Sequence, residues 1–526
     1  MRFGKLHSYI NGTYTEADGA SLPVIYPATN ETIAEFYVAG SDLLDRAVTD
    51  AIEAQRHWAA LLPAQRARIL SRAADLIRSR NDELAVLEVW DTGKPIQEAL
   101  TVDIVSGADA VEYFAHAAAL IQGQYYPLGS SFAYAIPEPL GVVAGIGAWN
   151  YPFQIACWKS APALAAGNAM IFKPSEMTVM TALKLAEIYT EAGLPDGLFQ
   201  VLLGDASLGK SIVAHPEIHK VSLTGEVGTG KKIMASAAET LKHVTLELGG
   251  KSPLLIFEDA DLDNAVQAAM MANFFTQGEI CSNATRVFVH SSVEQDFLER
   301  LKRATDKLII GDPMDPKTQI GALISKEHCE KVNSYLKAGL AEQARRYLGN
   351  DSPEIFSNPD EDPLQSVSAF MNKSSDAMAQ RSDLQVLLEG SRRTGQALKA
   401  GNFVAPTVFV NCTDQMKIVR EEIFGPVMSV LRFEDEEEAI RRANATPYGL
   451  AAGVFTKDIN RGHRIARALQ AGIVWINNYN LTPIEIPFGG YKQSGLGREN
   501  SLEALKAYLQ LKTVYIEAGD VDSPYR

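Results

Sequence analysis

The feature that most constrains the fold is an alternation of short β-branched runs with helical segments between residues 141 and 248. Strands are expected at 141–149, 169–172, 199–203, 220–224 and 244–248, with helices at 152–166 and in the stretches that end at 192, 214 and 238. Strands separated by helices run parallel, because each helix returns the chain to the same edge of the sheet. The pattern therefore predicts an α/β protein with a doubly wound parallel sheet.

Chemically distinctive side chains follow these strands. Open parallel sheets bind ligands beyond the carboxyl ends of their strands, so we expect a binding site along this edge. The residues at strand ends are Asn150, Lys173, Glu176, Gly225, Glu226 and Glu247.

The chain on either side of this region is also patterned. Helical spacing predicts helices over 42–58, 63–88 and 102–121. After residue 250, strands are expected at 254–257, 407–410, 427–433, 453–455 and 473–476, with helices at 261–275, 436–443 and 462–469. A final run, 511–516, alternates as a strand without a local partner, which favours pairing across a subunit boundary.

Residues 345–383 differ from their surroundings, because they are rich in Ser, Asp, Pro and Asn. We expect an exposed insertion there. A lid or a partner-binding loop is the alternative, because long loops in compact domains are often functional.

Length and charge limit the classes of function. At 526 residues the chain is too long for one core and should form several domains. Its net charge of -15 argues against a nucleic-acid partner and favours neutral or cationic ligands. No run is apolar for long enough to span a membrane, and no cleavable leader pattern is visible, so we expect a cytoplasmic protein without a membrane partner.

The four cysteines are Cys157, Cys281, Cys329 and Cys412, and they are far apart without a CxxC pair. They predict neither a disulfide framework nor a metal site. Cys281 differs from the others because it lies in the stretch NFFTQGEICSNATRVFV, between Gly278 and Asn283. Small and polar neighbours would let a substrate carbonyl approach, so we interpret Cys281 as a nucleophile; an inert core cysteine is the alternative.

One motif points to a different class of protein. Residues 204–211, GDASLGKS, satisfy the phosphate-loop pattern and lie between a predicted strand and a predicted helix. An NTPase that depends on Lys210 is therefore a second hypothesis. It is disfavoured because the pattern is short and because it leaves Cys281, Glu247 and Asn150 unexplained.

Seven motifs in order across nearly the whole chain carry a resemblance to a known family. They are WNYPF (149–153), IFKPSE (171–176), LTGEVGTG (223–230), LELGGKSP (246–253), the Cys281 window, EEIFGPV (421–427) and PFGGYKQSGLGRE (487–499). The chain resembles the NAD(P)-dependent aldehyde dehydrogenase superfamily and, within it, the betaine aldehyde dehydrogenases.

The resemblance implies an aldehyde dehydrogenase-like fold. Residues 1–123 and 141–249 would form the NAD-binding domain around the doubly wound sheet. Residues 250–488 would form an αβ catalytic domain with the 345–383 insertion. Residues 124–140 and 489–526 would form a β oligomerisation segment of a homotetramer or a dimer.

The resemblance also implies catalytic roles. Cys281 would be the attacking thiol, the Asn150 amide and the Cys281 backbone N–H would hold the oxyanion, and Glu247 would be the general base. This complete set argues against a catalytically inactive relative. Glu247 also argues against a CoA-acylating enzyme, because it would direct water onto the thioester.

For the cofactor, the resemblance implies NAD, with NADP as an alternative. Glu176 should accept hydrogen bonds from the adenosine ribose and repel a 2′-phosphate. Glu226 departs from the commonest superfamily pattern, which has Ser. The residues assigned to the cofactor are Trp149, Lys173, Ser175, Glu176, Gly225, Glu226, Gly230, Leu248, Glu422 and Phe424.

The expected substrate is a small cationic aldehyde. Tyr151 and Trp158 are seven residues apart on one predicted helix and project from the same face. By resemblance they line the aldehyde tunnel with Tyr479 and Phe488, and aromatic faces attract an ammonium group. Betaine aldehyde is the first hypothesis, with aminoaldehydes and 4-trimethylammoniobutyraldehyde as alternatives. Aromatic residues that only fill the core are the structural alternative.

Overall fold

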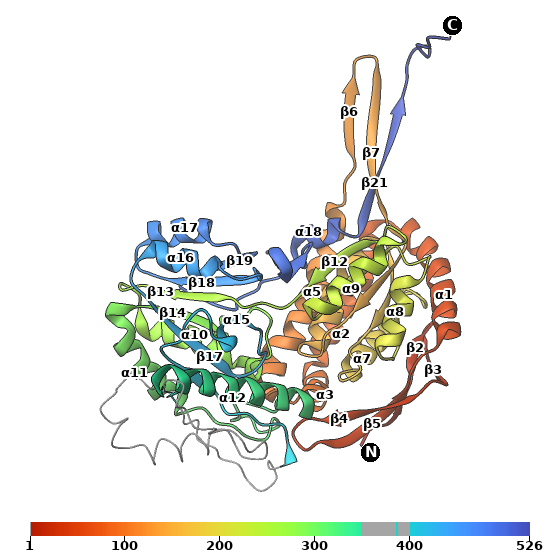
Figure 1. The fold of residues 1–526 in the computed structure, drawn as a ribbon. Helices are drawn as coiled ribbons and strands as arrows, with labels where there is room; N and C mark the ends of the chain where they lie inside the picture. Colours follow the sequence, from red (N-terminus) through yellow and green to blue (C-terminus); the bar gives the residue numbers. More distant parts are fainter. Residues whose placement is uncertain (1, 349–385, 388–399, 526) are drawn as a thin grey trace.

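Two mainly parallel sheets organise the chain, and Figure 1 shows them in two lobes that lie side by side. The computed structural model describes residues 2–348, 386–387 and 400–525. Within these residues, the first lobe contains an eight-stranded sheet, and the second contains a seven-stranded sheet. An α/β architecture with a parallel sheet in each lobe agrees with the predicted fold class.

The first sheet has the order β20-β12-β11-β8-β9-β10-β2-β3. Its five central strands run parallel, and every residue of β9 and β10 is buried, as expected for strands covered on both faces. The strands are β2 (Ser8–Ile10), β3 (Thr13–Thr15), β8 (Val142–Ile146), β9 (Ala169–Lys173), β10 (Phe199–Val201), β11 (Lys220–Thr224), β12 (His243–Glu247) and β20 (Gly495–Leu496).

Helices pack around this sheet. One of them, α6, begins at Pro152, which suits a first helical turn because its N–H would be unpaired there. The helices of the lobe are α1 (Ser41–Ala60), α2 (Pro63–Ser79), α3 (Asn81–Thr92), α4 (Ile96–Glu98), α5 (Ile104–Ala117), α6 (Pro152–Ala165), α7 (Met180–Ala192), α8 (Ala206–Ala214) and α9 (Val227–Ala238).

The second sheet has the order β15-β16-β17-β14-β13-β18-β19 and is parallel apart from β15. Its strands are β13 (Pro253–Ile256), β14 (Arg286–His290), β15 (Val386–Leu387), β16 (Thr407–Phe409), β17 (Val427–Phe433), β18 (Ala451–Phe455) and β19 (Ile473–Ile476). The helices of this lobe are α10 (Leu262–Phe274), α11 (Glu294–Thr305), α12 (Lys326–Leu348), α15 (Lys417–Arg420), α16 (Glu436–Asn444) and α17 (Ile459–Ala468).

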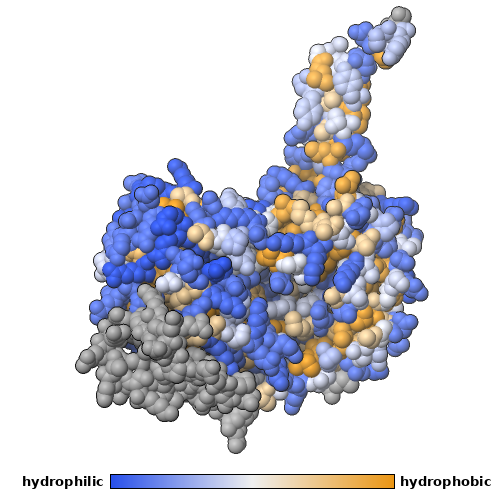
Figure 2. Space-filling model, viewed as in Figure 1, coloured by the Kyte–Doolittle hydropathy of each residue, from blue (hydrophilic) through white to orange (hydrophobic). Residues whose placement is uncertain are grey.

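A narrow three-stranded arm projects from the first lobe (Figure 1). It consists of β6 (Gln124–Leu128), β7 (Ser131–Pro139) and β21 (Leu509–Ile516). All eight residues of β21 pair with β7 of the same chain, so the terminal strand does have a partner, contrary to expectation. The partner lies some 370 residues earlier in the chain, where local sequence reasoning does not reach. Apolar side chains nevertheless remain exposed on the arm, including Leu511 (73%), Tyr125 (65%) and Tyr515 (56%) (Figure 2).

Two further differences from the predictions lie in the first 90 residues, and one prediction is not tested. The helix predicted over 63–88 is two helices, because the backbone leaves helical geometry at Arg80, before an Asn-Asp pair that favours a helix start. Residues 4–37, for which no strands were predicted, form β2, β3 and a small sheet of β1 (Gly4–Leu6), β5 (Glu31–Tyr37) and β4 (Ser21–Tyr26). The predicted insertion at 345–383 begins in α12 and, from residue 349, lies outside the described residues.

Two absences hold for the part of the chain that the structure describes. None of its helices has both the length and the apolar character needed to cross a membrane. No group of three or more His, Cys, Asp or Glu side chains in these ranges could hold a metal ion.

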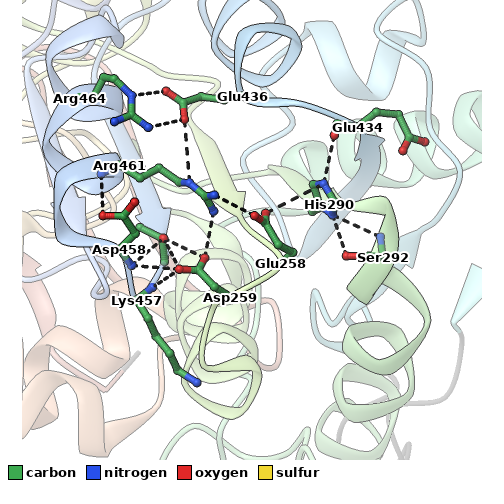
Figure 3. Close-up of polar contacts among 11 residues, drawn as sticks. Glu258, Asp259, His290, Ser292, Glu434, Glu436, Lys457, Asp458, Arg461 and Arg464 are labelled. Carbon is green, nitrogen blue, oxygen red and sulfur yellow. Dashed lines mark hydrogen bonds and ion pairs between the residues drawn. The ribbon is translucent and has the colours of Figure 1, made fainter.

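A polar network closes the carboxyl end of the second sheet, as Figure 3 shows. Asp259, which follows β13, accepts hydrogen bonds from Thr456 Oγ1 and from the backbone N–H groups of Lys457 and Asp458. Arg461, from α17, forms ion pairs with Asp259 at 3.1 Å and with Glu258 at 2.8 Å. These hydrogen bonds and ion pairs attach the segment between β18 and α17 to the end of β13.

Replacing Asp259 by Ala tests this attachment. We expect the free energy of unfolding to fall by about 1–3 kcal/mol, because two backbone donors and a hydroxyl lose their acceptor. The measurement is the midpoint of urea unfolding. Asp263→Ala is the matched control, because it removes a carboxylate that forms only a solvent-exposed pair with Arg300 and should have little effect. Equal midpoints for the Asp259→Ala variant and the unaltered protein would contradict the prediction.

Candidate active site

A cavity of about 850 Å³ lies where the two lobes meet. Its wall includes Asn150 from the turn after β8, Glu247 at the end of β12, and Cys281 from the loop before β14. These three residues are 97 and 34 positions apart in sequence, yet they face one space. The structure therefore brings together the three predicted catalytic residues.

Asn150 is buried and held in a fixed orientation. Its Nδ2 donates a hydrogen bond of 2.9 Å to the backbone carbonyl of Glu279, two residues before Cys281. A carboxamide nitrogen carries two hydrogens, so one N–H remains to donate into the cavity. This arrangement can stabilise negative charge on an oxygen atom bound beside Cys281.

Glu247 is buried, and neither of its carboxyl oxygens has a hydrogen-bond partner in the structure. Burial and the neighbouring Glu499 raise the pKa of Glu247 well above its usual value, while Lys159 and Arg498 oppose the rise. A carboxylate with a raised pKa and free oxygens is a stronger base towards water. Its backbone is fixed by β20, which pairs Gly495 with Glu247.

Lys159 and Glu499 form a buried ion pair of 2.7 Å on the wall of the same cavity, and sequence analysis did not predict this pair. Ser222 Oγ accepts a hydrogen bond from Lys159 and donates one of 2.9 Å to Glu499. One signal was available, since Lys159 interrupts an otherwise apolar helix and a buried charge needs a partner. The pair places an ionisable network beside Glu247.

The Cys281 thiol is half-buried and in the un-ionised form at neutral pH. Burial, Glu247 and Glu422 raise the pKa of Cys281 to about 12. The two carboxyl groups act in this direction because a thiolate next to a negative charge is unfavourable. A positive charge bound in the cavity would have the opposite effect and favour the thiolate.

Three of the four predicted substrate residues line the cavity: Tyr151, Trp158 and Phe488. The Trp158 and Phe488 rings meet edge to face, with centroids 5.7 Å apart. Tyr479 differs from the prediction, because it lies behind the wall and is only 1% exposed. Its hydroxyl donates to the backbone carbonyl of Ser282, so it supports the loop that carries Cys281.

The predicted cofactor residues gather elsewhere, and none of them lines this cavity. Lys173, Ser175 and Glu176 lie at the carboxyl end of β9, where Lys173 Nζ is 3.5 Å from a Glu176 carboxyl oxygen. Gly225 and Glu226 precede α9. Gly230 lies inside that helix and packs against Leu248, where a Cβ atom added to Gly230 would be 2.8 Å from the Leu248 side chain.

The remaining cofactor residues bridge the two lobes. Glu422 accepts a hydrogen bond from the backbone N–H of Gly250. The Phe424 and Trp149 rings meet edge to face at 5.2 Å. His328 Nε2 donates a hydrogen bond of 2.6 Å to the backbone carbonyl of Phe424. Residues of the two lobes therefore contact each other beside the turn after β8 and the segment after β12.

The effect of Glu247 on the thiol can be measured with a neutral alkylating reagent. Removing a carboxylate lowers the pKa of Cys281, so at pH 8–9 the Glu247→Gln variant should be alkylated about 2–10 times faster than the unaltered protein. The measurement is the pH dependence of the iodoacetamide rate. Cys281→Ser identifies the part of the signal due to the other cysteines. An unchanged or slower rate in Glu247→Gln would contradict this electrostatic assignment.

Comparison with known proteins agrees with this geometry. The family model described as "Aldehyde dehydrogenase family" matches residues 14–361 and 363–514. A betaine aldehyde dehydrogenase of Mesorhizobium japonicum is 52% identical over 518 residues, covering 98% of each chain. One of Sinorhizobium fredii is 51% identical over 523 residues, covering 99% of each chain.

Solved structures show the same fold. The aldehyde dehydrogenase KauB from Pseudomonas aeruginosa has a TM-score of 0.87 at 37% identity, with 97% of this chain and 96% of that chain covered. An NAD+ complex of an aldehyde dehydrogenase from Bacillus cereus has a TM-score of 0.87 at 38% identity, with 98% and 97% covered. The match extends over both lobes and confirms the resemblance, and the chain belongs to the aldehyde dehydrogenase family.

Proposed function

We propose that the protein oxidises betaine aldehyde to glycine betaine with NAD, and that Cys281, Asn150 and Glu247 carry out the chemistry. The observation that carries the proposal is that these three side chains face one cavity at the junction of the lobes. The names of relatives at 51–52% identity over nearly the whole chain supply the substrate hypothesis.

The roles follow from the positions of the side chains. Cys281 sulfur adds to the aldehyde carbon, and the thiol proton passes to a base in the cavity. Asn150 donates an N–H to the oxygen that becomes negative. A dinucleotide held by the residues at the end of the first sheet would supply the hydride acceptor for that carbon. Glu247 then takes a proton from water, the water oxygen bonds to the thioester carbon, and the carbon–sulfur bond breaks to release the acid and the thiol.

The residues at the end of the first sheet fit a dinucleotide. The first backbone N–H groups of α9 have no side-chain cap, and unpaired amides at a helix start bind phosphate oxygens. Lys173 would hold the adenosine ribose, and the exposed Glu176 carboxylate would accept bonds from its hydroxyls. Since a carboxylate repels a 2′-phosphate, we propose a preference for NAD over NADP.

The cavity has features that suit a cation. Aromatic rings of Tyr151, Trp158 and Phe488 form part of the wall, and the acidic residue Glu485 lines the same space. An ammonium group gains about 0.5–2 kcal/mol from each aromatic face that it contacts. A cationic aldehyde would also offset the effect of Glu247 and Glu422 on the Cys281 thiol.

The size of the cavity favours a second candidate substrate. A space of about 850 Å³ exceeds what a molecule as small as betaine aldehyde fills. Longer aldehydes with a terminal cation, such as aminoaldehydes and 4-trimethylammoniobutyraldehyde, would extend further along it.

The NTPase hypothesis lacks support from the geometry of its motif. Asp205 caps α8 and accepts a hydrogen bond from the Ser207 backbone N–H at 2.8 Å. In a phosphate loop such amides bind phosphate, whereas here the chain's own carboxylate takes one of them.

Substrate preference tests the proposal. With NAD, we expect kcat/KM for betaine aldehyde to exceed that for propanal by roughly tenfold or more, since each 1.4 kcal/mol of added attraction gives a factor of ten. NADP should support slower turnover than NAD. Steady-state kinetics with both aldehydes, aminobutyraldehyde and 4-trimethylammoniobutyraldehyde provide the comparison. In Trp158→Leu the advantage over propanal should shrink. A higher kcat/KM for propanal than for betaine aldehyde would contradict the proposed substrate.

We also propose that the arm joins subunits, because exposed apolar residues on a projecting sheet mark an interface. The unaltered protein should therefore be at least a dimer in light scattering coupled to size exclusion. Leu511→Asp should shift the mass towards the monomer, whereas Lys512→Ser, on the same strand, should not. A monomeric unaltered protein would rule out this role for the arm.

A further inference from the structure

The turn before the nucleophile has an uncommon backbone. Thr276, Gln277 and Gly278 all have positive φ, at 49°, 42° and 81°. Side chains disfavour this region, and a β-branched residue such as Thr276 does so most strongly. Such a conformation persists only where the surrounding structure imposes it.

Glu98 is the group that holds this turn from the first lobe. Its carboxyl oxygen Oε2 accepts hydrogen bonds from both the backbone N–H and the hydroxyl of Thr276, each at 2.9 Å. Glu98 and Thr276 are buried, at 6% and 1% exposure, so water competes little for these bonds. On the opposite side, a Cβ atom at Gly278 would be 2.2 Å from the Gly425 carbonyl carbon, so the second lobe presses directly on the turn.

Thr276 also contacts Tyr151, which lines the substrate cavity. The Thr276 hydroxyl has one hydrogen, which it donates to Glu98. The Tyr151 hydroxyl, 2.7 Å from Thr276 Oγ1, must therefore be the donor to it. Lys94 Nζ lies 3.9 Å from the centroid of the Tyr151 ring and is paired with the buried Asp103. The Tyr151 ring is thus held at its hydroxyl and over its face.

We propose that Glu98 is a positioning residue for the reaction, which acts through Thr276 on two groups at once: the loop that presents Cys281 and the Tyr151 wall of the substrate cavity. The role requires a hydrogen-bond acceptor at this place. It does not require Glu98 to touch the substrate, and Glu98 does not line the cavity. The kinetic consequence rests on the proposed function, whereas the effect on the turn does not.

The kinetic experiment compares Glu98→Ala, Glu98→Gln and Thr276→Val, with rates divided by the concentration of folded protein, measured by near-ultraviolet circular dichroism, so that unfolded protein is not counted. A misplaced nucleophile lowers kcat, so Glu98→Ala should lose roughly 10–100-fold in kcat, with a smaller rise in KM because the Tyr151 wall of the substrate cavity is no longer held. Gln keeps an acceptor oxygen, so Glu98→Gln should stay within about threefold of the unaltered enzyme. Thr276→Val removes only the hydroxyl and should give an intermediate loss.

Hydrogen exchange supplies a measurement that needs neither cofactor nor aldehyde. Amides of residues 276–281 should exchange faster in Glu98→Ala than in Glu98→Gln. Glu191→Gln, which removes an exposed pair with Arg80, is the control and should leave both measurements unchanged. If Glu98→Ala does not fold, the kcat and the hydrogen exchange of Thr276→Val test the proposal instead.

Two results would overturn the proposal: an unchanged kcat per folded protein in Glu98→Ala, or equal losses in Glu98→Gln and Glu98→Ala. If betaine aldehyde is not oxidised but another aldehyde is, the proposed substrate fails, and the variants are compared with that aldehyde.

Discussion

The loop from Thr276 to Ser282 is held from both lobes, and the site exists only because of this double attachment. From the first lobe, Glu98 holds Thr276, and Asn150 holds the Glu279 carbonyl. From the second lobe, Tyr479 holds the Ser282 carbonyl, and Asn480 accepts a bond from the Ser282 hydroxyl. Cys281 therefore cannot move with one lobe alone. Its thiol keeps its place relative to Glu247 only while the lobes are docked.

Burial explains the electrostatics of the site. Desolvation is the largest cause of the raised pKa of both Cys281 and Glu247. The same loss of solvent makes an unpaired charge costly, which accounts for the Lys159–Glu499 pair on the cavity wall. The loss of solvent around Cys281 and Glu247 strengthens each hydrogen bond and each charge that a substrate brings beside them.

Sequence patterns located the helices and strands whose signals lie within a few consecutive residues. The five parallel strands β8–β12 of the first sheet, α6, and the strands β13, β16, β17, β18 and β19 of the second sheet were placed within a few residues, because short β-branched runs and helix starts are local signals. The strands β2, β3, β14 and β20 were not predicted. The helix predicted over 63–88 is interrupted at Arg80, where the backbone leaves helical geometry, and hydrophobic spacing alone does not show this interruption. The pairing of β21 with β7 and of β20 with β12 joins distant segments, which periodicity cannot identify.

The candidate site likewise combines residues that the sequence identified with residues that it did not. Motif resemblance found Cys281, Asn150 and Glu247, and the structure places them on one cavity. It did not find Glu98 or Glu499, whose partners Thr276 and Lys159 are far away in sequence. Tyr479 was placed on the wall by resemblance, whereas in the structure it lies behind the wall and its hydroxyl donates to the Ser282 carbonyl.

The most direct test of the account is to trap the covalent intermediate. When Glu247→Gln is mixed with betaine aldehyde and NAD, peptide mass spectrometry should find the acyl group on the peptide that contains Cys281, with about one NADH formed per subunit and little further turnover. An acyl group on another residue, or full turnover by Cys281→Ser, would contradict the claim that this sulfur carries the reaction.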